Sequence, residues 1–555
     1  MAVTQGSGSL RREVGTFSLM MTGLGSIIGS GWLFGAWRAS QLAGVGSVWA
    51  WLLGAFMATT IAITYVELGS MLPESGGMVR FSHLSHGSLV GFVAAWANWI
   101  TIVAVIPVEA EASVQYMASW TWPWAQALYV HLPDGHGELS LPGLAIAAVL
   151  VIIYFLLNFW GVKLFARSNA TITAFKLVVP ALTGLTLIAS GFDARNFHAL
   201  PGSGGGIDPA AVLTAVATAG IVFSFNGFQS PVNLAGEARN PARSVPIAVL
   251  GSIGLATVVY VILQVAYLGA VPHTMLAKAG WHGVDFRSPF AELALLANLN
   301  WLALLLYADA FVSPSGTGIT YTATTARMIY GMERNGTLPR FLGRLSPAWG
   351  VPRHAMWLNL IVSFLFLFFF RGWGTLAAVI SVSTIISYVA GPVAAMTLRR
   401  TAPAVHRPLK VAALPVVACL AFIFATELLY WAKWPLTGQV LLLMLIALPI
   451  YAFSLRGQGW AQFVPQLAGA WWLILYLPCI AVVSWAGSPR FGGHGYLAWG
   501  WDLVLVAVIG LVFYLWGVRS GWVTPALEQA YGLRLEVPPE LDEAPGGKAL
   551  PDGTG

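Results

Sequence analysis

Stretches of about 20 mostly apolar residues recur along almost the whole chain, and this pattern limits the possible folds more than any other feature of the sequence. A helix of that length crosses the hydrocarbon core of a bilayer and pairs its own backbone groups there. Only 9% of the 555 residues are charged, whereas a soluble domain carries about 25%. Because so few charges cannot cover a water-exposed surface, we predict an all-α polytopic membrane protein.

Fourteen apolar segments are candidate transmembrane spans. They lie near residues 14–37, 46–71, 88–110, 141–158, 168–190, 210–232, 246–270, 296–322, 355–370, 374–397, 411–431, 437–455, 470–486 and 499–517. With the N-terminus in the cytoplasm, 20 of the 28 Lys and Arg residues fall in segments on the cytoplasmic side and 6 in segments outside. The positive-inside rule therefore favours about 14 spans with cytoplasmic tails at 1–12 and 521–555. The second tail is polar, acidic and rich in Pro and Gly, which favours disorder.

Two of these spans contain a break in the apolar pattern. The first carries four glycines between residues 23 and 31, and the sixth reads Phe-Ser-Phe-Asn-Gly-Phe at 223–228, followed by Pro231. Unwound backbone at membrane depth survives where it lines a cavity; its free N–H groups then attract an anion and its free carbonyls a cation. Close packing of helices through small residues is the alternative explanation for the first break.

Four stretches resemble the amino acid–polyamine–organocation (APC) permeases. They are Gly-Ser-Ile-Ile-Gly-Ser-Gly within 25–34, Tyr-Val-Glu-Leu-Gly-Ser-Met-Leu-Pro-Glu-Ser-Gly-Gly at 65–77, Phe-Lys-Leu at 175–177, and Ala-Gly-Glu-Ala-Arg-Asn-Pro-Ala-Arg-Ser-Val-Pro at 235–246. The segments 107–112 and 309–314 are closest to the bacterial aspartate–proton symporter branch. The resemblance covers roughly residues 10–455.

The resemblance implies a LeuT-type fold, a 5+5 inverted repeat around a site at the middle of the membrane. The core would then be 13–400, with repeats at 14–190 and 210–400, each opening with a broken helix. Four additional C-terminal helices would occupy 401–520, two more spans than the common form of the family has.

The two breaks are the predicted substrate-binding site. We expect N–H groups of the first break to bind the carboxylate of an amino acid and carbonyls of the second to meet its amine. The predicted binding residues are Ser26, Ile27, Gly29, Ser30, Gly31, Phe223, Ser224, Phe225, Asn226 and Gly227.

Four ionisable residues at membrane depth are candidates for proton coupling: Lys176, Asp309, Glu111 and Glu109. The resemblance implies that Lys176 replaces a sodium ion, since proton-coupled members carry Lys there; a Lys that reaches the inner interface is the alternative. Glu109 and Glu111 point to different sides of a helix, so at most one faces the pathway, unless both form a water-exposed pair at the outer interface. Asp309, which is placed more deeply, is the preferred acid.

Charged residues at the inner ends of the second and sixth spans are candidates for gating or for fixing loops by ion pairs. They are Glu67, Glu237 and Arg239.

These features predict a secondary active transporter that imports amino acids across the cytoplasmic (inner) membrane by proton symport, with aspartate or glutamate favoured. Exchange of one metabolite for another, and transport of neutral or cationic amino acids, stay open as alternatives. A membrane-embedded enzyme is the alternative from another class, but the sequence has no HExxH, paired-His or nucleophile-elbow motif.

Other partners follow from composition. Cys419 and Cys479 lie in separate apolar runs, so neither a metal site nor a cofactor site is expected. No block of five or six basic residues indicates nucleic-acid binding. The expected partners are an amino acid, protons and membrane lipid, the last at the arginine-rich loop 327–353.

Overall fold

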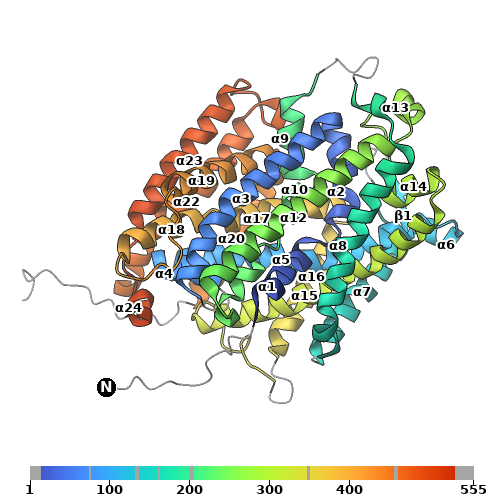
Figure 1. Ribbon diagram of the computed structural model, residues 1–555. Helices are drawn as coiled ribbons and strands as arrows, with labels where there is room; N and C mark the ends of the chain where they lie inside the picture. Colours follow the sequence, from blue (N-terminus) through green and yellow to red (C-terminus); the bar gives the residue numbers. More distant parts are fainter. Residues whose placement is uncertain are drawn as a thin grey trace, which may run out of the picture.

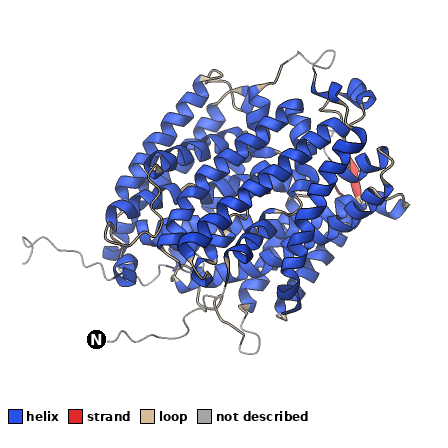
Figure 2. Ribbon diagram, in the orientation of Figure 1, coloured by secondary structure: helices blue, strands red, loops and turns tan. Residues whose placement is uncertain are grey.

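The computed structural model describes residues 14–73, 77–131, 137–160, 163–198, 206–346, 351–454 and 460–531. These residues form a bundle of helices with one small β-hairpin at its edge (Figure 1, Figure 2). The predicted tail at 1–12 and most of the predicted tail at 521–555 lie outside the described residues.

Helices occupy the predicted spans. The first group is α1 (Thr16–Ile27), α2 (Gly31–Ala43), α3 (Ser47–Met71), α4 (Gly77–His86), α5 (Ser88–Met117), α6 (Pro123–Gln126), α7 (Leu141–Phe159) and α8 (Lys163–Gly191). The second is α9 (Pro209–Thr218), α10 (Ile221–Phe225), α11 (Ser230–Asn233), α12 (Pro241–Ala270), α13 (His273–Ala279), α14 (Pro289–Leu296), α15 (Asn300–Arg334), α16 (Arg353–Phe369), α17 (Trp373–Tyr388) and α18 (Ala390–Thr401). The third is α19 (Leu414–Trp431), α20 (Leu436–Leu445), α21 (Ala447–Ser454), α22 (Trp460–Ala486), α23 (Trp501–Ser520) and α24 (Pro525–Tyr531). Short 3₁₀ turns are η1 (Gly44–Gly46), η2 (Ala194–Phe197), η3 (Ala235–Glu237) and η4 (Pro489–Phe491).

Length and apolar composition identify the membrane-spanning helices. Within the described residues, 11 helices are long and apolar enough to cross a membrane, or up to 12 if the bent pair in the sixth span counts as one. α1 and α16 are apolar but shorter, and α1 is one half of the broken first span. The prediction of an all-α polytopic membrane protein is confirmed.

The two predicted breaks are present and lie against each other. α1 ends at Ile27 and α2 begins at Gly31, and in the sixth span α10 ends at Phe225 and α11 begins at Ser230. A separate bend of 49° lies between Thr218 and Ile221, ahead of the predicted break. Gly227 has a φ of +121°, and a Cβ on it would lie 2.6 Å from the carbonyl carbon of Ser26. Only a glycine allows this approach, since other residues are strained at that φ and would collide with the first break.

α5 runs through the centre of the bundle. All of its residues except Ser88 and Val93 are buried, and it packs against α7, α15, α16 and α17. In contrast, α23 leaves apolar side chains such as Val504, Val508 and Val512 exposed, as expected of a helix that faces lipid. Polar groups on α5 are therefore far from water.

The two ends of the bundle have different structures. At one end, which we call the Glu67 end, α3 and α18 finish beside each other. At the other, the hairpin end, β1 (Tyr129–His131) pairs antiparallel with β2 (Gly137–Leu139). Leu139 N also donates to Arg371 O at 2.7 Å, which attaches the hairpin to the segment before α17.

The beginning of the second tail is ordered, contrary to the expectation of disorder from residue 521 onward. Trp522 N donates to Ser85 O at 3.2 Å, and Thr524 Oγ1 donates to Leu84 O at 2.8 Å. Leu527 of α24 is fully buried. This segment is ordered because it caps the free carbonyls at the end of α4. Such a contact cannot be predicted from composition alone.

Replacing Gly227 with Ala should destabilise the protein, because the methyl group meets the Ser26 backbone and the left-handed φ is strained. We expect a loss of about 2–3 kcal/mol, seen as a lower unfolding midpoint in detergent. Gly254→Ala is the control, since nothing lies within 4 Å of its Cβ position in α12; it should be neutral or slightly stabilising. Equal midpoints for the two variants would contradict the contact between the breaks.

Candidate functional site

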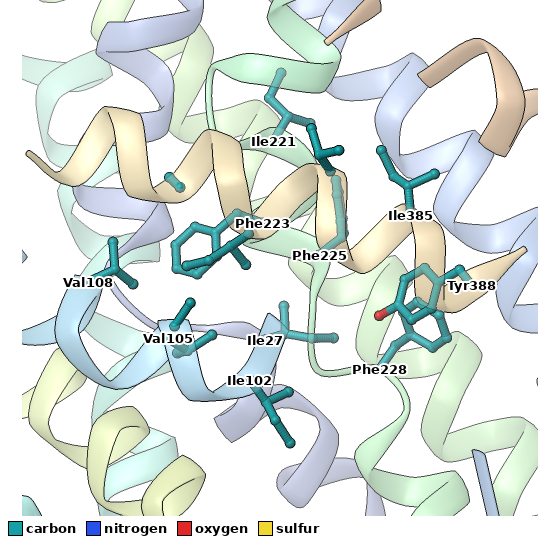
Figure 3. Packing of buried hydrophobic residues seen from close by; sticks show 14 of the residues in the cluster. Ile27, Ile102, Val105, Val108, Ile221, Phe223, Phe225, Phe228, Ile385 and Tyr388 are labelled. Atoms are coloured by element: carbon teal, nitrogen blue, oxygen red, sulfur yellow. The ribbon is translucent and has the colours of Figure 1, made fainter. Parts of the chain in front are cut away.

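A small cavity lies where the two breaks meet α5 and α15. It is lined by Ser26, Ile27, Gly29, Val105, Glu109, Phe223, Asn226, Thr317 and Tyr321. Its volume is about 10 Å³, room for about one water molecule. Figure 3 shows apolar side chains of α5, α10 and α17 packed around Ile27 of the first break. In this conformation the cavity is therefore too small to hold an amino acid.

The carboxylate of Glu109 reaches into the first break. Its Oε2 accepts a hydrogen bond from the backbone N–H of Ser30 at 2.8 Å. A Cβ on Gly29 would collide with Oε1, so the glycine makes room for this carboxylate. Glu109 thus occupies the position that the sequence predicted for the carboxylate of a substrate.

Lys176 fixes the other side of the break. Its ammonium donates to Gly25 O at 2.8 Å and to Thr317 Oγ1 at 2.6 Å. The side chain is 2% exposed, so it does not reach an interface as the alternative supposed. Lys176 is close enough to Glu109 and Asp309 for their charges to interact.

The remaining two acids lie outside the cavity lining. Asp309 Oδ1 accepts from Ser313 Oγ at 2.7 Å, and both carboxyl oxygens of Glu111 lack a hydrogen-bond partner among the described residues. Glu109, Glu111 and Asp309 each have 0% exposure, so the glutamates do not form a water-exposed pair. Of the three acids, Glu109 and not the preferred Asp309 lines the cavity.

Several predicted binding residues hold the breaks together instead of lining the cavity. Ser224 Oγ donates to its own helix at Gly220 O, and a Cβ on Gly31 would collide with Ser224. Phe225 packs on Tyr260, with ring centroids 5.5 Å apart. Close packing and a small cavity are thus both present, in different parts of the two breaks.

Tyr260, which the sequence did not single out, caps both breaks. Its hydroxyl lies 3.2 Å from Ile27 O and 3.1 Å from Ser224 O, two carbonyls that the breaks leave without helical partners. No sequence signal distinguished this tyrosine from the other aromatic residues of its span.

An aromatic cluster closes the cavity toward the hairpin end. Trp373 Nε1 donates to Ser30 Oγ at 2.8 Å. The centroid of its ring lies 4.8 Å from that of Phe34 and 5.9 Å from that of Phe223. We call these three residues the aromatic gate: Phe34, Phe223 and Trp373. The gate connects α17 directly to the first break.

A polar and aromatic cluster closes the opposite side. The Tyr388 hydroxyl donates to Gln229 Oε1 at 2.9 Å and lies 3.3 Å from Asn226 Oδ1. Phe228 packs on Tyr388 with centroids 5.0 Å apart (Figure 3). Tyr388 thus holds α17 against the second break.

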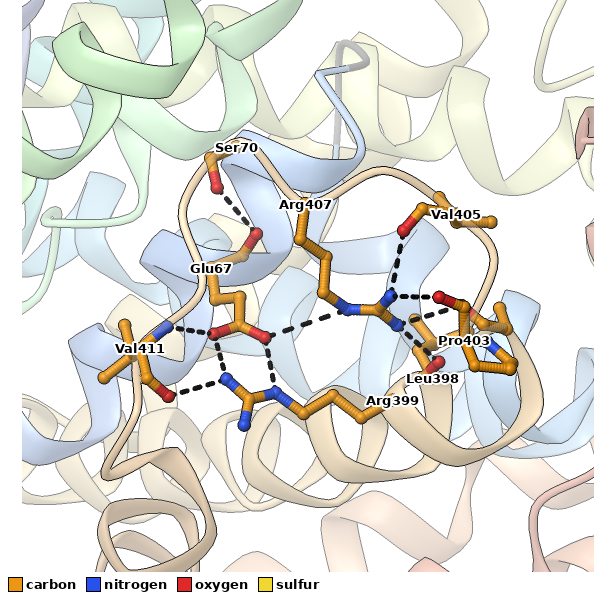
Figure 4. A network of polar contacts seen from close by, with 9 residues as sticks. Glu67, Ser70, Leu398, Arg399, Pro403, Val405, Arg407 and Val411 are labelled. Atoms are coloured by element: carbon orange, nitrogen blue, oxygen red, sulfur yellow. Dashed lines mark hydrogen bonds and ion pairs between the residues drawn. The ribbon is translucent and has the colours of Figure 1, made fainter.

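The predicted gating residues separate into two places. Glu67 accepts from Arg399 Nε at 2.7 Å and from Val411 N at 2.9 Å, and Arg407 Nε lies 4.0 Å away (Figure 4). This network joins α3 to α18 and to the loop that follows α18. The ion pair is buried, since the Glu67 side chain is only 2% exposed.

Glu237 and Arg239 lie elsewhere, on the loop after α11. Val14 N donates to Glu237 O, and Arg239 N donates to Val14 O, both at 3.0 Å. This short parallel pairing joins the start of α1 to the end of the second break, so the two residues act here through their backbones.

Comparison with known proteins adds to this geometry. A family model described as "Amino acid permease" matches residues 14–455. The glutamate/serine transporter AimA of Bacillus subtilis is 55% identical over 97% of this chain and 99% of that protein. The aspartate-proton symporter of the same organism is 33% identical over 94% of this chain and 99% of that protein. The branched-chain amino acid permease BcaP, also of Bacillus subtilis, is 26% identical over 81% of this chain and 94% of that protein.

Thr317→Val should destabilise the site, because the Lys176 ammonium loses its hydroxyl acceptor in a buried place. A hydrogen bond to a buried charge contributes about 1.5–3 kcal/mol, so the unfolding midpoint in detergent should fall. Thr320→Val on the same helix is the control, since its hydroxyl donates only to Gly316 O; its effect should be within about 0.5 kcal/mol. Equal effects would contradict a special role for Thr317.

Proposed function

Since this chain belongs to the amino acid permease family and is a membrane transporter of amino acids, we propose that it imports them by proton symport. It would act as a secondary active transporter of the cytoplasmic membrane and accept acidic amino acids. The observation that carries this proposal is the Glu109 carboxylate on the Ser30 N–H.

Glu109 provides a route for coupling. An ionised carboxylate accepts strongly from an N–H, and protonation weakens it as an acceptor. Binding of a proton to Glu109 would therefore release the Ser30 N–H for the carboxylate of a substrate. Proton and substrate would then favour each other's binding, as symport requires.

Lys176 would supply the fixed positive charge of the site. Its contacts with Gly25 O and Thr317 Oγ1 place an ammonium where the carbonyls freed by the break would hold a cation. We propose that this charge makes sodium unnecessary, and that Asp309 and Glu111 adjust the charge around it. The substrate amine would meet carbonyls at the end of α10, next to Phe223 and Asn226.

The proposed substrate class rests on relatives and on charge. The names of two relatives include glutamate, serine and aspartate. An anionic substrate entering a site with Glu109 nearby is costly unless an acid there is protonated. Acidic substrates and proton symport therefore support each other.

We also propose an orientation. The distribution of Lys and Arg puts the Glu67 end and both termini in the cytoplasm and the hairpin end outside. The core at 13–400 would contain the inverted repeats 14–190 and 210–400. The four spans after 400, formed by α19, α20 with α21, α22 and α23, would buttress α18 and α5. Two relatives match over 97% and 94% of the chain, so the matched sequence extends into these last helices.

Gly29→Leu should abolish binding of labelled glutamate to the detergent-solubilised protein. The larger side chain would fill the space that now holds the Glu109 carboxylate, and it would block access to the Ser30 N–H. Gly254→Leu, in open space on α12, should bind as the wild type does.

Competitors in the same assay test the substrate class. Unlabelled aspartate should displace glutamate, and arginine should not. Displacement by arginine but not aspartate would defeat the acidic assignment, and undiminished binding by Gly29→Leu would defeat the placement of the site.

Lys176→Ala should lose accumulation of glutamate in proteoliposomes under an imposed pH gradient, while exchange of labelled for unlabelled substrate persists. The reason is that the variant lacks the charge at Gly25 O and Thr317. Lys278→Ala, an exposed lysine of α13, should accumulate like the wild type. Stimulation of wild-type uptake by sodium in place of protons would count against the proposal.

A further inference from the structure

A second set of unpaired donors lies on the hairpin side of the aromatic gate. Arg38 lies eight residues after Ser30 on α2, about 12 Å along the helix axis. Arg38 is not among the residues that line the cavity between the breaks.

The Arg38 guanidinium has one hydrogen bond and spare donors. NH1 donates to Gln41 Oε1 at 3.1 Å, and the group lies over the Trp37 ring, 4.3 Å from its centroid. Its Nε is buried without a hydrogen-bond partner in the described part of the chain. Arginine binds carboxylates with two parallel N–H groups, and these are the groups left over here.

The guanidinium lies beside the first turn of α17. The Cβ position of Gly374 is 3.0 Å from both Nε and NH2 of Arg38, so a glycine is what lets the two approach. α17 begins after Gly372 without a side-chain cap, and Leu376 N is the first amide that bonds back, to Gly372 O. The preceding amides carry the partial positive charge of a helix N-terminus.

Two positive groups in contact, a guanidinium and an uncapped helix start, are electrostatically unfavourable without an anion. Asp285 is a carboxylate whose charge acts on Arg38, but its Oδ2 lies 3.3 Å from Nδ1 of His131 in the hairpin. The hairpin's Glu138 lies 3.8 Å from Arg371. Arg38 itself forms no ion pair with any described residue.

The position relative to the gate gives this group a role. Phe34 is one turn before Arg38 on α2 and packs on Trp373, which in turn bonds Ser30. An anion bound to Arg38 would therefore lie next to the gate, on its hairpin side.

We propose that Arg38 and the first turn of α17 form an outer binding station for the carboxylate of an acidic amino acid, occupied before the gate opens. The station rests on the proposed function, since it needs a dicarboxylate substrate and a hairpin end that faces outside. It captures external substrate and plays no part in the coupling between the breaks, so its loss raises the external KM and leaves the accumulation ratio, an equilibrium quantity, unchanged.

Arg38→Gln should test the station in right-side-out and inside-out membrane vesicles. We expect the KM for external glutamate to rise about tenfold, with a smaller rise for serine, which carries no net charge. The KM for glutamate from the cytoplasmic side and the final accumulation ratio should stay unchanged. Arg490→Gln is the matched control, because it removes a positive charge at the same end that is bound to Asp208 and stacked on Trp499.

Two further variants keep the test decisive if Arg38→Gln is unstable. Arg38→Lys keeps the charge and should raise the external KM less than Arg38→Gln does. Gly374→Ala keeps Arg38 but moves it away from α17, and we expect an intermediate rise in the external KM. An unchanged external KM, or equal changes on both sides, would overturn the station. Wild-type protein that transports no acidic amino acid would overturn the proposed substrate class and the station with it, whereas normal glutamate transport with an unchanged external KM in Arg38→Gln would overturn the station alone.

Discussion

Unwound backbone in the middle of a membrane must find partners for its N–H and C=O groups, and this requirement organises the centre of the bundle. Glu109 from α5 accepts from Ser30 N, Lys176 from α8 donates to Gly25 O, and Tyr260 from α12 lies against Ile27 O. Each partner comes from a different span. The breaks therefore hold the bundle together as well as forming its cavity.

Under the proposed function, the same contacts would allow the site to be both stable and active. A carboxylate on a backbone N–H is an arrangement that a substrate carboxylate can reproduce, so exchange between the two leaves no N–H unpaired. The gate above and Tyr388 below make direct contacts with the breaks, at Ser30 and next to Asn226. In the proposed transport cycle, movement at the cavity would therefore act directly on both closures.

The buried pair of Glu67 and Arg399 gives the Glu67 end a fixed closure (Figure 4). Separating α3 from α18 would leave a buried carboxylate without its arginine, which costs several kcal/mol unless water enters. The hairpin end has no equivalent ion pair at the gate in the described residues; rings and one indole N–H close it there. The two sides of the cavity therefore differ in what must be broken for them to open.

The sequence by itself determined the helical membrane fold, the two breaks and the set of polar residues at membrane depth. These features are local: hydropathy over 20 residues, glycines in an apolar run, and a charge within a span. Glu109, Lys176 and the residues 26–29 and 223–226 could be selected in this way.

Tertiary structure alone decided which of these residues meet. Glu109 faces the break and Glu111 does not, Asp309 lies behind Ser313, and Glu67 pairs with Arg399, which is 332 positions away along the chain. Tyr260, Trp373 and the buried start of the second tail had no local signal. The physical reason is that the rotation of each helix about its axis, and the choice of its neighbours, follow from packing over the whole bundle and not from any short pattern.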